Sequence, residues 1–296
     1  MMKPLHGRMC STPLIWRVLL LLALMLVFTA LALGIWFVGF SGSQTTASLK
    51  CMQMLQTVGT FLLPCIVGAW LWSERPAEWL HINKPIVWRE ALTVVVLMLC
   101  AMPFINLLAW LNSRLVLPDF LHGLEELIKQ QEETAAQLTE RFIRADSVWI
   151  LMLNILFMAL LPAIGEEFFF RGTLQTMFSE KTNRHVAVWC SAILFSFIHF
   201  QFYGFVPRML LGALFGYLLL WSGSLWLPVL AHFTNNCMAV LLYNLYYMRG
   251  MDVEEIDALG TGSTLWLGIV SGVVTVVLIY LLRSSRTMRR ASSLMS

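Results

Sequence analysis

Long apolar runs recur along the whole chain and limit what it can fold into. Each is close to the roughly 20 residues needed to cross about 30 Å of hydrocarbon. Charged residues make up only 12% of the chain, whereas soluble domains have about 25%. The sequence therefore predicts an all-α, polytopic membrane bundle of about eight transmembrane helices. The runs lie near residues 14–40, 51–72, 91–111, 147–170, 186–203, 206–222, 226–247 and 264–283.

Basic residues are distributed unevenly, and this predicts the orientation of the bundle. They precede or open the first run and follow the last, so the positive-inside rule places both termini in the cytoplasm. The first run is too long to be the apolar part of a cleavable signal peptide, so we expect it to remain as a membrane helix. These features are typical of an integral protein of the bacterial cytoplasmic (inner) membrane. The residues are Lys3, Arg8, Arg17, Arg283, Arg286, Arg289 and Arg290.

Cysteine spacing and net charge argue against two classes of protein. The six cysteines are scattered without metal-ligand spacing, so we expect small buried thiols rather than a disulfide framework. A formal charge of +3 is too small to indicate a nucleic-acid partner. The expected partners are the lipid bilayer and a peptide or membrane-protein substrate.

Three charged residues interrupt the fourth apolar run, although each costs about 2.5–3.5 kcal/mol at bilayer depth. Glu167 lies four residues before Arg171, the favourable spacing for an ion pair on one helix face. Glu166 points about 100° away from Glu167 and is not neutralised by that contact. We therefore predict a structural Glu167–Arg171 pair and a Glu166 carboxylate that is available for chemistry.

Two later helices carry polar residues at a spacing of four. Phe195 precedes His199, and His232 precedes Asn236, so each pair occupies one helix face. An antiparallel connection near residues 179–185 would bring His199 to the depth of Glu166. We expect the polar members of the two pairs to form one functional site with Glu166, and Phe195 to support it by packing.

A glutamate beside a histidine in a dry cavity can activate water for amide hydrolysis. His232 and Asn236 could stabilise the developing oxyanion. Glu166, His199 and His232 also match the ligands of a zinc site with an open position, so zinc is the possible cofactor. Two alternatives are a catalytically silent scaffold or immunity protein, and a proton-coupled carrier in which these residues relay protons.

The motifs EExxxR (Glu166, Glu167, Arg171), FxxxH (Phe195, His199) and HxxxN (His232, Asn236) occur in this order on successive helices. They resemble the motifs of the CAAX-protease and bacteriocin-processing (CPBP or Abi) family, which are intramembrane endopeptidases related to the type II CAAX-prenyl endopeptidase. The resemblance covers roughly residues 147–247. It implies an eight-helix bundle with a cytoplasm-facing cavity and endopeptidase activity.

The same resemblance assigns roles to individual residues. It makes Glu166 and His199 the water-activating pair and His232 and Asn236 the oxyanion donors. The choice between a metallopeptidase and a glutamate peptidase stays open, with the metal-free chemistry favoured. The eukaryotic branch cleaves after a prenylated cysteine, whereas bacterial relatives look like processors of peptides or membrane proteins, or immunity factors against bacteriocins.

We expect one structural domain in three parts. Residues 1–146 contain three transmembrane helices and a polar amphipathic insertion at about 113–146. Residues 147–247 form the four-helix catalytic core, and residues 248–296 contain the last transmembrane helix and a basic C-terminal tail. The insertion is interpreted as a connector outside the membrane, with a lid or a partner surface as alternatives.

Overall fold

The computed structural model describes residues 7–115, 118, 120 and 122–294, and side chains as far as Ser284. Every regular element in this part of the chain is a helix, which confirms the all-α fold class. The elements are α1 (Leu14–Phe40), α2 (Thr46–Gln56), η1 (Thr57–Leu62), α3 (Leu63–Trp72), α4 (Pro76–Trp79), α5 (Trp88–Asn112), α6 (His122–Ile143), α7 (Val148–Asn154), η3 (Ile155–Leu160), α8 (Leu161–Glu167), η4 (Phe168–Gln175), α9 (Thr176–Ser179), α10 (Arg184–Phe197), α11 (Phe205–Ser222), α12 (Trp226–Arg249), α13 (Glu254–Ala258), η5 (Gly262–Thr264) and α14 (Leu265–Leu294).

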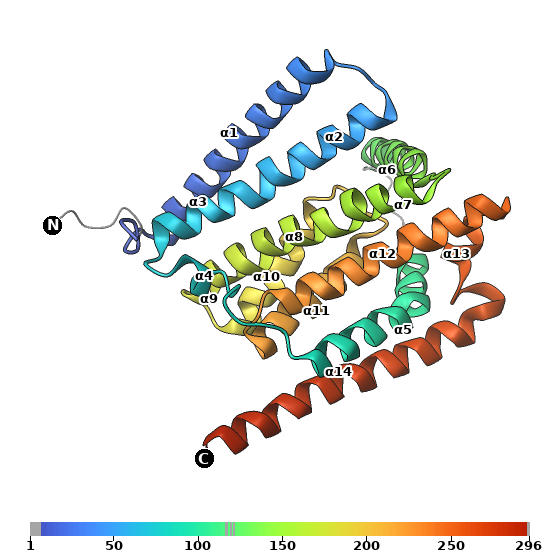
Figure 1. Cartoon of the computed structure of the whole chain (residues 1–296). Helices are drawn as coiled ribbons and strands as arrows, with labels where there is room; N and C mark the ends of the chain where they lie inside the picture. Colours follow the sequence, from blue (N-terminus) through green and yellow to red (C-terminus); the bar gives the residue numbers. More distant parts are fainter. Residues whose placement is uncertain (1–6, 116–117, 119, 121, 295–296) are drawn as a thin grey trace.

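The long helices lie side by side in one row, backed by two others (Figure 1). The row runs from α1 through the continuous helix α2–η1–α3, the continuous helix α7–α9, α12 and α5 to α14. Helices α10 and α11 pack against each other and against η4, α12 and α5. The segments η1, η3 and η4 are π-helical, a wider winding that often occurs at functional sites.

Six helices in the described part of the chain are long and apolar enough to cross a membrane, so this is an integral membrane protein. They are residues Leu14–Phe40, Thr46–Trp72, Trp88–Asn112, Val148–Ser179, Phe205–Ser222 and Gly262–Ser284. Helix α10 is apolar but short, and α12 carries several polar residues, including His232 and Asn236. The count of eight spans, the cytoplasmic location of the termini and the three-part division stay predictions.

Two helix ends differ from the sequence-based expectation. The fifth apolar helix ends at Phe197 rather than near residue 203, so His199 lies in the turn that follows it. The last helix continues to Leu294, which makes the expected basic tail helical in its backbone. The insertion forms the amphipathic helix α6, and its residues 116, 117, 119 and 121 lie outside the described residues.

The two ends of the bundle differ in what they contain. The start of α1 and the end of α14 lie at one end of the bundle along the helix axes, whereas α6 and α13 lie at the opposite end (Figure 1). Connections that carry acidic side chains, such as Glu254 and Glu255 of α13, belong to the second end. This separation matters for the direction from which a substrate reaches the site.

A close contact between helices fixes the depth and rotation of α8. A Cβ atom added at Gly165 would lie 2.8 Å from Cγ2 of Thr57 on η1, so α8 can approach η1 this closely only without a side chain there. The three phenylalanines that follow α8, Phe168, Phe169 and Phe170, are buried in the main apolar core. Packing on both sides of residues 166 and 167 therefore holds these two glutamates in place.

Candidate active site

Glu167 and Arg171 form the predicted ion pair. Arg171 Nη1 donates to Glu167 Oε1 over 2.7 Å, and both side chains are completely buried. Arg171 lies within η4, so the pair forms along a π-helical turn. A buried pair of this kind is stabilising only when further hydrogen bonds support it. Helices α11 and α12 each supply one, whereas Oε2 of Glu167 and Nε of Arg171 have no hydrogen-bond partner among the described residues.

Helix α11 and Phe195 complete the surroundings of Arg171. Its Nη2 donates to the carbonyl oxygen of Gly212 over 3.0 Å, and its guanidinium lies 4.4 Å from the centre of the Phe195 ring. A Cβ atom at Gly212 would come within 3.1 Å of Phe195 and 3.2 Å of Arg171 Nη2. The glycine therefore allows α11 to reach the guanidinium with its backbone. Sequence reasoning did not identify this position.

His232 of α12 binds to the same carboxylate oxygen as Arg171. Its Nδ1 lies 2.8 Å from Glu167 Oε1, and its ring stacks on Phe215 with a centroid distance of 5.2 Å. A carboxylate paired with Arg171 can only accept at this contact, so Nδ1 carries the proton. In the neutral ring the other nitrogen, Nε2, then presents a lone pair, and it donates only when the ring is an imidazolium.

His199 is held by the helix that precedes it. Its Nδ1 donates to the carbonyl oxygen of Phe195 over 2.7 Å, and Phe200, one residue later, has a left-handed backbone with φ of 52°. The spacing of four between Phe195 and His199 therefore has a backbone role in addition to ring packing. Because Nδ1 is the donor, the neutral ring again presents a lone pair at Nε2.

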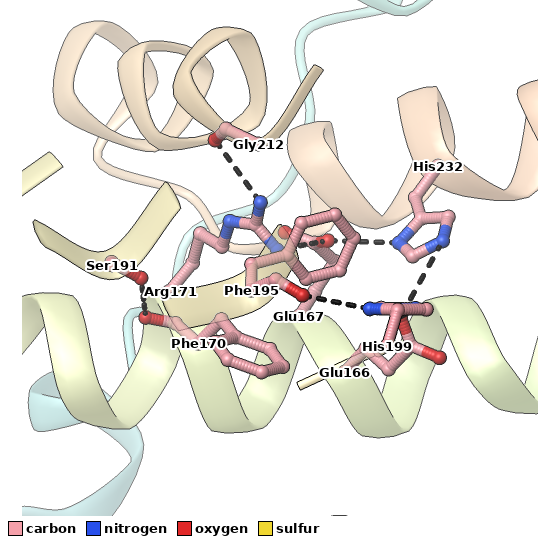
Figure 2. Close-up of polar contacts among 9 residues, drawn as sticks. All are labelled: Glu166, Glu167, Phe170, Arg171, Ser191, Phe195, His199, Gly212 and His232. Atoms are coloured by element: carbon pink, nitrogen blue, oxygen red, sulfur yellow. Dashed lines mark hydrogen bonds and ion pairs between the residues drawn. The ribbon is translucent and has the colours of Figure 1, made fainter. Parts of the chain in front are cut away.

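Glu166 lies where the two histidines converge. Its Oε2 atom is 3.8 Å from Nε2 of His199 and 3.8 Å from Nε2 of His232. Figure 2 shows the three side chains directed toward one another from different elements. Both distances exceed the length of a hydrogen bond, so neither histidine hydrogen-bonds directly to the Glu166 carboxylate. The side chain of Glu166 is 16% exposed, against 0% for Glu167, which separates a reachable carboxylate from a structural one.

Asn236 lies one turn after His232 on α12 and is half-buried. Its Oδ1 accepts from Nδ2 of Asn235 over 3.2 Å. Among the contacts of the described residues, none joins its side chain to Glu166 or to either histidine. Its amide nitrogen therefore keeps its donor capacity.

The possible zinc site has suitable donors but not a ligand arrangement. Two imidazole Nε2 lone pairs and a carboxylate are typical zinc ligands, and a carboxylate behind one histidine is a common supporting partner. Among the described residues, however, no group of three His, Cys, Asp or Glu side chains is arranged to hold a metal ion. The residues as arranged therefore do not fit a bound zinc ion.

Arg208 is a charged residue of the site that sequence reasoning missed. It lies in the first turns of α11, and its guanidinium interacts electrostatically with Glu166 and His199. The signal was present in the sequence, because Arg208 is a lone charge at the start of an apolar run, and such charges mark functional sites.

A cavity of about 1050 Å³ lies beyond the site. Its lining includes Gln201, which follows His199, and Ala239, which lies one turn after Asn236. Its other walls come from α5, α6 and α13, at the end of the bundle opposite the start of α1 (Figure 1). The sequence predicts cytoplasmic termini, and the family resemblance implies a cavity that faces the cytoplasm. Because this cavity lies at the end opposite the start of α1, the two predictions cannot both be correct for it.

Comparison with known proteins confirms the predicted family resemblance over the central segment. Residues 148–238 match the family described as "Type II CAAX prenyl endopeptidase Rce1-like", and this range contains every motif residue of the site. A curated protein from Bacillus subtilis (strain 168), "Uncharacterized protein YpbD", is 33% identical over 84 residues. That alignment covers 27% of this chain and 40% of the relative, so the chain spans less than half of the relative's length. No solved structure matches significantly.

Proposed function

We propose that this chain is an intramembrane endopeptidase of the CAAX-protease type that uses Glu166 as its general base. The observation that carries the proposal is the convergence of two Nε2 atoms on Oε2 of Glu166, each at 3.8 Å. Rce1-like proteins are described as endopeptidases, and the matched range contains all three residues. This supports peptide-bond hydrolysis over a purely structural use of the cluster.

Glu166 and His199 would activate the water together. A water molecule that donates one hydrogen to Oε2 of Glu166 and the other to Nε2 of His199 keeps an oxygen lone pair for attack. Its oxygen bonds to the peptide carbonyl carbon as a proton passes to Glu166. Transfer of a proton to the peptide nitrogen then breaks the carbon–nitrogen bond and yields a carboxylic acid and an amine.

His232 and Asn236 would stabilise the tetrahedral oxyanion. His232 can donate from Nε2 only as an imidazolium, because its Nδ1 is held by Glu167. Asn236 would donate from its amide nitrogen. Both side chains project from α12, so one helix places both donors on the same side of the peptide.

Substrate class and metal use are tested together. Purified wild type is incubated with quenched fluorescent peptides, prenylated and unprenylated, before and after zinc chelation, with His199→Gln as the inactive control. We expect cleavage of unprenylated peptides that survives chelation, and loss of cleavage in His199→Gln. Loss on chelation, restored by zinc, would overturn the metal-free mechanism. If no peptide is cleaved and a Glu166→Gln strain keeps every phenotype, a non-proteolytic immunity or scaffold role replaces the endopeptidase.

A further inference from the structure

Arg208 differs from Arg171, the fully buried arginine of the site, in the charge of its partner. Arg171 is paired with the carboxylate of Glu167 and with the carbonyl of Gly212, and its Nε has no hydrogen-bond partner in the part of the chain that the structure describes. Arg208 is half-buried, and its Nη2 donates to the neutral side chain of Gln201. Its Nη1 is buried and has no hydrogen-bond partner among the described residues. One N–H group of a cation at the site therefore has an unused capacity to donate.

Arg208 is linked both to the catalytic groups and to residues that line the cavity. The guanidinium interacts electrostatically with Glu166 and with Glu132 of α6. Its partner Gln201 lines the cavity, as does Gly204, where a Cβ atom would lie 3.0 Å from Arg208 Nη2. A substrate that enters from this cavity would therefore reach the residues that contact the guanidinium.

The site has few other hydrogen-bond donors for an oxyanion, which gives Arg208 a role. Nδ1 of His199 and Nδ1 of His232 are both engaged, and their Nε2 atoms carry lone pairs in the neutral rings. His232 contributes a donor to an oxyanion only when protonated, whereas an arginine is a donor at every working pH. The tetrahedral intermediate places a new negative charge beside Glu166, where a preorganised cation is most effective.

We propose that Arg208 is a further catalytic residue, whose Nη1 donates to the peptide carbonyl oxygen and stabilises the oxyanion formed on attack by the Glu166-activated water. This inference rests on the proposed endopeptidase function and adds a third oxyanion donor, from α11, to the two on α12. Gln201 holds the guanidinium at its other nitrogen. The arrangement explains why a charged residue is kept at the start of an otherwise apolar helix.

The test measures kcat and KM for peptide cleavage by wild type, Arg208→Gln and Arg208→Lys. We expect Arg208→Gln to lower kcat about 10²–10³-fold, as for loss of one oxyanion donor, with KM changed less than about threefold. Lysine keeps the charge but not the fixed donor, so Arg208→Lys should recover part of kcat. The matched control is Arg249→Gln, an exposed arginine in the last turn of α12, which should retain wild-type kinetics.

The outcomes distinguish failure of the proposed endopeptidase function from failure of the proposed role of Arg208. Failure of wild type to cleave any peptide counts against the endopeptidase function itself. If wild type cleaves and Arg208→Gln keeps its kcat, or changes only KM, the oxyanion role is wrong. If Arg208→Gln is not monodisperse in detergent, the folded Arg208→Lys variant decides, because an unchanged kcat there would show that the fixed guanidinium donor is not needed.

Discussion

His232 Nδ1 lies 2.8 Å from Oε1 of Glu167, the oxygen that also accepts from Arg171. One buried carboxylate thus links the ion pair of η4 to a histidine on α12. The link fixes which nitrogen of His232 carries a proton and directs the other toward Glu166. The second glutamate of the EExxxR motif therefore holds His232 in place, and in the proposed mechanism the first is the reactive one.

Breaking the buried pair from one side should strongly destabilise the protein. Arg171→Met leaves Glu167 as a buried, uncompensated charge, and removal of one partner of such a pair costs about 3–5 kcal/mol. The double variant Glu167→Gln with Arg171→Met removes both charges and should be less destabilised than Arg171→Met alone. Thermal unfolding in detergent measures both. A double variant that is less stable than Arg171→Met would contradict a pair held together by charge.

Helix α11 should not tolerate a side chain at Gly212. Gly212→Ala places a methyl group within 3.1–3.2 Å of Phe195, Ala192 and Arg171, and overpacking of this kind costs about 1–3 kcal/mol. We expect a lower melting temperature and reduced peptide cleavage, because Phe195 also holds His199. Gly39→Ala in α1 is the matched control, since nothing lies within 4 Å of a Cβ atom there. Equal effects in the two variants would show that the close approach is unimportant.

The docking of α6 against the segment that contains Tyr203, called its attachment below, should depend on pH through Glu125. The hydrogen bond from Lys129 and then that from the Tyr203 hydroxyl lower the pKa of Glu125 below its usual value of 4.5. Lys129 lies on α6 itself, so only the Tyr203 hydrogen bond couples this carboxyl to docking. Its contribution stabilises the docked form above the undocked pKa and is lost as pH falls through the docked pKa. The attachment of α6 should therefore weaken below pH 4.5.

Tyr203→Phe removes the 2.8 Å hydrogen bond to Glu125 and should reduce this loss at low pH. Limited proteolysis of α6 between pH 3 and 7, with an acid-tolerant protease, follows the attachment in both proteins. Since Tyr203 N–H also donates to Glu132 over 3.1 Å, the variant should stay attached at neutral pH. Identical pH profiles for the two proteins would show that Tyr203 does not control the Glu125 carboxyl.

The orientation predicted from basic residues places α6 and the cavity outside the cytoplasm. In a cysteine-free background, the exposed positions Glu133 of α6 and Arg75 near α4 can each be replaced by cysteine. A membrane-impermeant maleimide should label Glu133→Cys in intact cells and Arg75→Cys only after permeabilisation. The reverse pattern would show that the termini are not cytoplasmic and that the cavity faces the cytoplasm.

Local spacing in the sequence was sufficient for much of the fold and for the Glu167–Arg171 contact. Hydropathy located the helices because a bilayer demands long apolar runs, and the first helix has the expected bounds, Leu14–Phe40. The i, i+4 spacing predicted the ion pair, since both residues lie on one continuous helix. The depth argument correctly brought Glu166 and His199 together.

Contacts between distant helices were not predictable in this way. Neither the Gly212 carbonyl nor the Glu167–His232 bond has a local signal, because each depends on how α11 and α12 pack against η4. The end of α10 at Phe197 was missed because apolar side chains continue through Phe200 while the backbone turns. Arg208 had a signal as a lone charge, but only the structure links its guanidinium electrostatically to Glu166.

The most direct test of the account is the turnover number of Glu166→Gln. Glutamine keeps the size of the side chain but cannot accept a proton from water, so we expect kcat to fall by about 10²–10⁴-fold with an unchanged melting temperature. Glu133→Gln, an exposed glutamate of α6, should retain wild-type turnover under the same conditions. Turnover by Glu166→Gln equal to that of wild type would contradict the assignment of Glu166 as the general base.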